Sequence, residues 1–219
     1  MDKKRKVKYF KVLKDRICAS VLAFLSLTLT PAEPYRGGSG EWIEVADNTK
    51  KKQVHELLKI YSVVKTHRND LKDASVWAIS RTILEESRKH SLDPLLVLAV
   101  IRVESSFQDL AVSSEGARGL MQIRPIVANA MAEEVDLGSG EIPDPGSLDD
   151  PVLNIKLGVF YLRHLKKSFR DLKLVLTAYN WGPTEIRNRL EENEELPLEY
   201  AMKVLAAYHG YHKGKGQTR

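Results

Sequence analysis

Apolar residues recur at intervals of three and four along most of the chain after residue 50, which is the spacing of one face of an α-helix. The clearest stripes cover residues 54–64, 76–83 and 153–165, and the cap-and-proline pair Asp150-Pro151 marks the start of the third. Shorter helices are predicted over residues 172–179, 184–191 and 198–208. Strand-like alternation is scarce, so the pattern predicts a mainly α domain.

One predicted helix is apolar on nearly all sides. Residues 95–101 are seven consecutive apolar residues, preceded by Asp93, a good N-cap, and Pro94, which suits the first helical position. A buried strand is the competing interpretation of so short an apolar run. The Asp-Pro start and the continuation through Arg102 and Glu104 favour a helix that is buried all round.

Glu104 is a carboxyl group at the end of this apolar helix. Burial disfavours its charged form, and the negative potential at a helix C-terminus acts in the same direction. Both effects raise a carboxyl pKa, which is how proteins make a general acid near neutral pH. Taken alone, a glutamate at a helix end is more often a solvated surface residue.

Further segments follow Glu104 in a specific order. Residues 104–107 read ESSF, residues 114–125 SEGARGLMQIRP, residues 154–158 NIKLG with Tyr161-Leu162 after them, and residues 178–183 AYNWGP. Together these segments resemble the catalytic domain of the soluble lytic transglycosylases, over about residues 84–208. The resemblance implies a goose-type-lysozyme-like fold: a mainly helical, two-lobed domain with a substrate cleft and at most a small β-hairpin, near residues 113–123.

The resemblance also implies a reaction. Ordinary glycoside hydrolases need two carboxyl groups, whereas this family is understood to use one. Its glutamate protonates the glycosidic oxygen between N-acetylmuramic acid (MurNAc) and N-acetylglucosamine (GlcNAc) in peptidoglycan glycan strands. The same group then takes the proton of the MurNAc C6 hydroxyl as that oxygen attacks C1, which leaves a 1,6-anhydro end. By similarity, Glu104 has both the acid and the base role.

Five further residues correspond to the family's substrate site. Ser105 follows the glutamate and supports it, Met121 and Gln122 line the cleft, the Tyr179 hydroxyl lies near the glutamate, and Asn180 contacts substrate. Met121 and Tyr179 also have an ordinary structural interpretation. A methionine often fills space in the core, and a tyrosine is often a core aromatic whose hydroxyl is hydrogen-bonded.

Three residues depart from the pattern expected of the family. Arg118 lies within the GA-x-GLMQ element, Arg124 precedes Pro125, and Trp181 follows Asn180 where a small residue is common. An indole there offers either a stacking surface for a sugar ring or a packing contact with a neighbouring helix. Residues 137–150, rich in Gly, Pro, Ser and acids, predict a long loop that borders the cleft.

Two other functions compete with the transglycosylase. A hydrolytic, lysozyme-type muramidase would need a second carboxylate, for which Asp109 and Glu115 are candidates, although each is more typical of a solvated loop residue. A non-catalytic peptidoglycan-binding scaffold would have no need of an acid at the end of an apolar helix, so Glu104, Gln122 and Tyr179 together argue against it.

The charge of the chain does not indicate nucleic-acid binding. The net charge is +5, but the first sixteen residues carry eight Lys and Arg against two Asp, and the remainder is close to −1. Residues 17–30, fourteen residues without charge, follow this basic run and precede Pro31 and Pro34. The arrangement is typical of an export signal and favours that interpretation over nuclear import of the Lys- and Arg-rich residues 3–7.

These patterns divide the chain into four parts. Residues 1–32 are an export signal or membrane anchor, 33–83 a linker and helical extension, 84–209 the catalytic domain and 210–219 a flexible basic tail. The expected location is the periplasm or cell envelope. If the signal is not cleaved, residues 17–30 anchor the chain in the inner membrane. The sequence does not identify a partner in an envelope complex.

Cysteine and histidine usage predicts neither a disulfide nor a cofactor. Cys18 is the only cysteine, so no intrachain disulfide forms, and it lacks the preceding small apolar residues of a lipidation signal. His55-Glu56 begins a zinc-binding HExxH pattern, but Lys59 stands where the second histidine is required. We therefore expect no metal and no organic cofactor.

Overall fold

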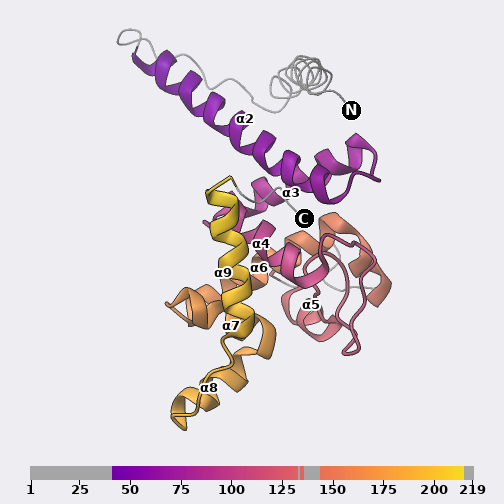
Figure 1. Cartoon of the computed structure of the whole chain (residues 1–219), viewed down its shortest axis with the longest axis vertical. Coiled ribbons are helices and arrows are strands. Elements are labelled where there is room, and N and C mark those ends of the chain that lie inside the picture. Colours follow the sequence, from indigo (N-terminus) through magenta and orange to yellow (C-terminus); the bar gives the residue numbers. More distant parts are fainter. Residues whose placement is uncertain (1–40, 133, 136–143, 215–219) are drawn as a thin grey trace. The chain divides into compact units, whose positions relative to one another are not determined.

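The computed structural model describes residues 41–132, 134–135 and 144–214, without the side chains of residues 41–49 and 132. The predicted export signal and the last five residues of the predicted tail lie outside these ranges. The described part is helical (Figure 1). Its helices are α2 (Glu41–His67), α3 (Asp73–Lys89), α4 (Pro94–Ser105), α5 (Pro125–Ala132), the 3-10 helix η1 (Pro145–Asp149), α6 (Pro151–Ser168), α7 (Leu172–Trp181), α8 (Pro183–Glu191) and α9 (Glu199–His212).

The mainly α prediction is confirmed. The described residues up to His55 belong to one unit and those from Glu56 onward to a second, which contains the end of α2 and the later helices of the described ranges. None of the helices in the described ranges combines the length and apolar character needed to cross a membrane.

The predicted helix starts are confirmed by their caps. Asp93 accepts a hydrogen bond from the Leu95 N–H at 2.8 Å, and Asp150 accepts one from the Leu153 N–H at 2.8 Å. In each case a proline occupies the first turn, where its missing N–H costs nothing. Asp171 caps α7 in the same way, so local capping fixes the start of three of the helices around the site.

Helix α4 is buried within the second unit. All its side chains from Leu95 to Ile101 are buried. Helix α9 packs along it, α3 packs against both α4 and α6, and α6 packs against α7. Near the start of α4, the Tyr208 hydroxyl of α9 donates to Asp93 Oδ2 at 2.6 Å, which ties the two helices together.

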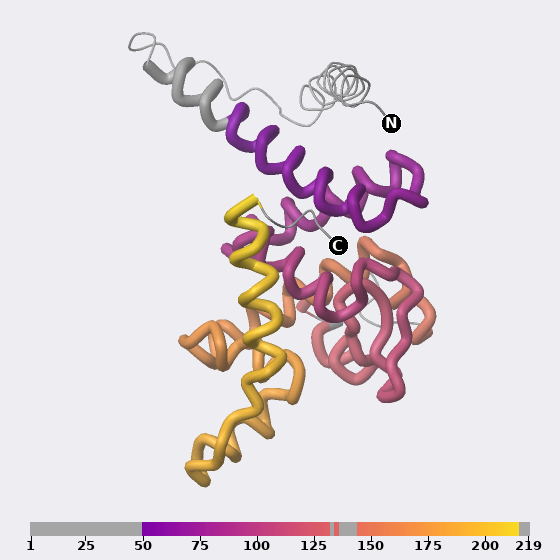
Figure 2. The backbone as a smooth tube through the Cα atoms, in the orientation of Figure 1, coloured from indigo at the N-terminus to yellow at the C-terminus, as the bar shows by residue number. Residues whose placement is uncertain are grey.

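The expected hairpin near residues 113–123 is reduced to two isolated antiparallel bridges, one between Val112 and Arg118 and one between Arg118 and Ile123. Between α4 and α5 the backbone doubles back on itself (Figure 2). Gly119 in this segment has φ +78°, and an added Cβ would lie 2.4 Å from the carbonyl oxygen of Leu148. Only glycine fits this close approach.

Asn154 of α6 anchors the hairpin to the helices. Its side chain is fully buried, and its Oδ1 accepts from the Met121 N–H at 2.7 Å. Its Nδ2 donates to the carbonyl oxygens of Arg118 at 2.8 Å and Leu148 at 2.9 Å. One amide therefore satisfies two backbone groups of the hairpin and one of η1.

Replacing Asn154 with Ala should lower the free energy of unfolding by about 2 to 4 kcal/mol, because buried backbone groups lose their partners. Chemical denaturation followed by circular dichroism measures the change. Asn188→Ala is the control, since Asn188 is exposed on α8 and its loss should change stability by less than about 0.5 kcal/mol. Equal stability of both variants would contradict the anchoring role.

Candidate active site

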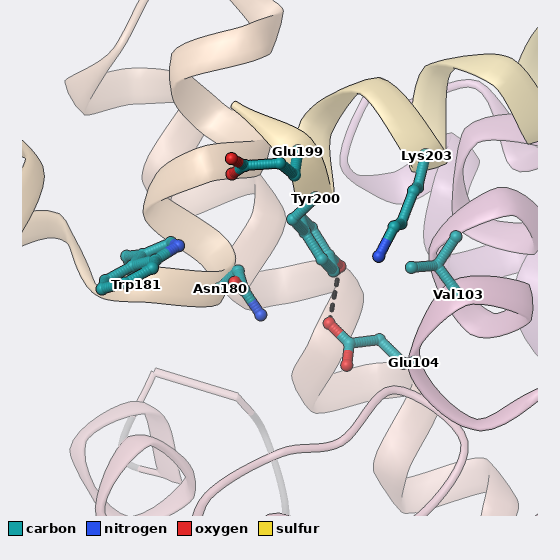
Figure 3. A pocket seen from close by; sticks show the side chains of 7 residues that line it. All are labelled: Val103, Glu104, Asn180, Trp181, Glu199, Tyr200 and Lys203. Carbon is teal, nitrogen blue, oxygen red and sulfur yellow. Dashed lines mark hydrogen bonds between the residues drawn. The ribbon is translucent and has the colours of Figure 1, made fainter. Parts of the chain in front are cut away.

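Glu104 lies in the last turn of α4 and faces a pocket with a volume of about 360 Å³. Helices α4, α7 and α9 contribute the lining (Figure 3). The lining residues are Val103, Glu104, Asn180, Trp181, Glu199, Tyr200 and Lys203. The carboxyl group therefore lies where a ligand in the pocket can meet it.

The protein raises the pKa of Glu104 to about 7. Burial is the main cause, because a carboxylate loses hydration when neighbouring helices cover it. A hydrogen bond from the Tyr200 hydroxyl to Glu104 Oε1, 2.5 Å long, acts in the opposite direction by stabilising the charged form. Because burial outweighs this bond, the carboxyl group gains and loses its proton near neutral pH.

Tyr200 is a site residue that the sequence did not indicate. It lies in the first turn of α9, 96 residues from Glu104 along the chain. Burial and the charge of Glu104 raise its pKa well above 10, so its hydroxyl stays protonated and donates. In the sequence it is one aromatic residue of a predicted helix, and nothing local relates it to Glu104.

Tyr179 is buried beside the site but does not bond to Glu104. Its hydroxyl donates to the Met121 carbonyl oxygen at 2.8 Å, and its ring lies 5.3 Å from that of Tyr161. Burial, and after it the charge of Glu104, raise the pKa of Tyr179 well above its usual value, so the hydroxyl stays protonated. Its direct partner is the hairpin backbone.

Ser105 and Met121 also support the site from within. The Ser105 hydroxyl bonds to the Leu120 carbonyl oxygen at 2.8 Å and joins the end of α4 to the hairpin. Met121 was expected to line the cleft, but its side chain is fully buried. It lies against Gly158 of α6, where an added Cβ would be 2.4 Å from its sulfur. The expectation was wrong for this side chain because close packing on a glycine holds it in the core.

Gln122 is held in the hairpin by its own amide group. Its backbone is left-handed, with φ +47°, and its Nε2 donates to the carbonyl oxygens of Ala111 and Gly119 at 3.0 Å each. Both amide hydrogens are therefore used inside the protein, and only the amide oxygen is left to contact a ligand.

Asn180 and Trp181 are the exposed residues of the AYNW motif, and both line the pocket. The Trp181 side chain is 50% exposed, and the Arg189 guanidinium lies 5.7 Å from the centre of its ring. An indole held in this way presents a flat apolar face, which suits contact with a sugar ring.

Of the two arginines that depart from the family pattern, Arg118 has a structural role and Arg124 lies on the surface. Arg118 makes a two-pronged ion pair with Asp149 of η1, at 2.9 and 2.6 Å, which joins the hairpin to the described end of the predicted loop. Arg124 is exposed. Residues 136–143 of that loop lie outside the described residues.

Acidic groups other than Glu104 differ in their surroundings. Asp109 is paired with Arg68 Nη1 at 2.6 Å, and Glu115 is exposed. Glu199, which the sequence did not indicate, lines the pocket but is exposed, and its carboxylate points away from Glu104 (Figure 3). Lys203 is also exposed, and its amine points into the same space as Glu104.

Comparison with protein families gives a match to the transglycosylase SLT domain over residues 81–202. A similar curated protein is membrane-bound lytic murein transglycosylase C of Mannheimia succiniciproducens, 30% identical over 131 residues. Its counterpart in Shigella sonnei is 36% identical over 110 residues. The matches cover 56% and 46% of this chain but only 35% and 30% of the relatives, so the chain spans about a third of their length.

Solved structures give the same fold. An inactive mutant of the lytic transglycosylase Slt from Pseudomonas aeruginosa matches with a TM-score of 0.54 and 25% identity, covering 64% of this chain and 24% of that one. The 70 kDa soluble lytic transglycosylase of Escherichia coli matches with a TM-score of 0.56 and 21% identity, covering 77% and 32%. The lysozyme-like fold expected from the sequence is thus confirmed.

The raised pKa of Glu104 makes stability depend on pH. Because the folded pKa of about 7 exceeds the reference value of 4.5, the folded state binds the proton more tightly. The stabilisation is complete below pH 4.5 and is lost as pH rises through 7. Relative to Glu104→Gln, the wild type should lose about 2 to 3 kcal/mol of unfolding free energy between pH 4.5 and pH 8.

Urea denaturation of the two proteins across this pH range measures the difference, in which the titration of all other groups largely cancels. A difference that stays constant with pH would show that Glu104 titrates at its ordinary value.

Proposed function

Because the chain belongs to the transglycosylase SLT domain family, we propose that it is a peptidoglycan lytic transglycosylase with Glu104 as its catalytic group. The observation that carries the proposal is the carboxyl group at the end of α4, which faces a pocket and has a pKa of about 7. A group with this pKa is present in both protonation states near neutral pH, so it suits acid and base work equally.

The proposed reaction needs one carboxyl group and no water. Protonated Glu104 donates its proton to the β-1,4 glycosidic oxygen between MurNAc and GlcNAc, and the C1–O bond breaks with GlcNAc leaving as an alcohol. Glu104, now a carboxylate, accepts the proton of the MurNAc C6 hydroxyl while O6 bonds to C1. The product is a 1,6-anhydro-MurNAc end, and Glu104 returns to its protonated state.

Tyr200 stabilises Glu104 while Glu104 is a carboxylate. Its hydroxyl donates to Glu104 Oε1, and this bond stabilises the carboxylate that exists between the two proton transfers. Burial favours the acid before the reaction, and the bond limits how far burial raises the pKa. The two opposing effects keep one residue competent in both roles.

The substrate is proposed to lie against the exposed residues of the pocket. Asn180 bonds to polar groups of the sugar, Trp181 packs on its ring face, and the Gln122 amide oxygen accepts from an N-acetyl N–H or a hydroxyl. Ser105, Met121 and Tyr179 hold the surrounding backbone in place and take part in binding indirectly.

The proposed location is the periplasm or cell envelope, where peptidoglycan is found. The basic and apolar pattern of residues 1–30 supports export, and two relatives carry the name membrane-bound. Anchoring through residues 17–30 is part of this proposal.

Glu199 gives the hydrolytic alternative a specific basis, because it is a second carboxylate in the pocket lining. Hydrolysis would require Glu199 to activate water on the far side of the sugar from Glu104. The exposure of Glu199 and the direction of its carboxylate, away from Glu104, favour the one-carboxyl reaction (Figure 3).

The first experiment is mass analysis of the soluble products that the purified protein releases from bacterial peptidoglycan. We expect 1,6-anhydro-muramyl ends from the wild type. The rate of product release should be lower in Glu104→Gln by a factor on the order of 100 or more, because the variant has no proton to transfer. Circular dichroism checks that the variant is folded.

Glu199→Gln is the matched control, since it neutralises the other pocket carboxylate. It should give the same anhydro products at a rate within about threefold of the wild type, because a solvated carboxylate contributes little to Glu104. Reducing ends from the wild type, together with their loss in Glu199→Gln, would favour a hydrolase. The absence of products from the wild type would favour a binding scaffold.

Tyr200→Phe should move the alkaline limit of kcat/KM upward from about pH 7, because loss of the hydrogen bond removes the influence that lowers the Glu104 pKa. Tyr208→Phe removes an equivalent tyrosine–carboxylate bond at the other end of α4 and should leave the limit unchanged. The pH dependence of peptidoglycan release measures both. A common shift in the two variants would contradict a specific effect of Tyr200.

A further inference from the structure

The chain reverses direction immediately after the catalytic helix. Helix α4 ends at Ser105, and the next two residues, Ser106 and Phe107, have left-handed backbones with φ of +50° and +68°. Residues other than glycine rarely adopt this backbone conformation, and it persists only where the surrounding structure holds it. Two such residues in succession, two and three positions after Glu104, require support from the surrounding structure.

The support comes from His67, the last residue of α2, and from Arg68, which follows it. The Phe107 ring is fully buried and stacks on the His67 ring, with 4.5 Å between centres and 10° between planes. Arg68 Nη1 donates to the Phe107 carbonyl oxygen at 2.9 Å. The left-handed turn is therefore held through both the side chain and the backbone of one residue.

Arg68 is itself fixed in place. It is only 7% exposed, its Nε and Nη2 bond to Asp70 at 2.9 and 3.0 Å, and its Nη1 also bonds to Asp109 at 2.6 Å. A planar guanidinium can serve these three partners together, whereas the single amine of a lysine cannot. Asp109, which lies two residues beyond Phe107, thus completes a clamp around the turn.

We propose that Arg68 is a positioning residue for Glu104, acting by clamping the turn at Ser106 and Phe107 through the Phe107 carbonyl and Asp109. The proposal rests on the proposed function of Glu104. Arg68 lies before residues 81–202, which match the family, yet in the same compact unit as Glu104. A residue that precedes the family domain thereby helps to position the proposed catalytic group.

The test compares Arg68→Lys and Arg68→Gln with the wild type, using the full chain. Release of the clamp moves the last turn of α4, and a displacement of about 1 Å costs roughly 100-fold in rate. We expect kcat to fall by about 10- to 100-fold in Arg68→Gln and less in Arg68→Lys, with KM within about threefold of the wild type.

A second readout does not depend on activity. The carboxyl carbon of Glu104, labelled with ¹³C and identified by its absence in Glu104→Gln, reports the pKa directly. In Arg68→Gln we expect this pKa to fall from about 7 toward its reference value of 4.5, because the displaced carboxyl group gains water.

Arg88→Gln is the control variant. It breaks an ion pair of the same length, 2.6 Å, between Arg88 of α3 and Glu56 of α2, and this pair does not include the turn. Its kcat should stay within about twofold of the wild type, since such exposed pairs contribute little.

Three results would overturn the inference: an unchanged Glu104 pKa in folded Arg68→Gln, a loss of kcat shared equally with Arg88→Gln, or unfolding of Arg68→Lys as well as Arg68→Gln. The last would assign Arg68 to the fold alone. An inactive wild type would defeat the proposed function separately, and the ¹³C titration would still decide the role of Arg68.

Discussion

Helix α4 must be covered on nearly every side, and most of the site follows from that constraint. Its buried apolar stretch is favourable only when the neighbouring helices exclude water from it. Helix α9 runs antiparallel along it, with Tyr208 bonded near its start and Tyr200 near its end. The cover that stabilises the helix also removes water from Glu104, so the fold and the acidity of the site have one cause.

The site is built in two layers with different tasks. The side chains of Ser105, Tyr179 and Asn154 bond to backbone groups of the hairpin and fix its path. The surface that a ligand meets comes from Asn180 and Trp181, at the end of α7. Motif residues thus fall into a buried set that shapes the backbone and an exposed set that faces the pocket, and the exposed set is small.

Features set by neighbouring residues could be predicted from the sequence. The Asp-Pro pairs at residues 93–94 and 150–151 gave two helix starts correctly, because a cap acts within one turn. The raised pKa of Glu104 also followed from its apolar helix. Features that depend on distant contacts were missed, as Tyr200 shows, since 96 residues separate it from Glu104. Met121 was misplaced because its packing partner, Gly158, lies on another helix.

The positions of these contacts along the chain also decide when Glu104 acquires its raised pKa. Synthesis proceeds from the N-terminus, so α4 emerges well before the helix that covers it. Until residue 200 has been made and α9 has docked, Glu104 is an ordinary solvated carboxylate, ionised near neutral pH. Its capacity to act as an acid is therefore acquired only when α9 packs on α4.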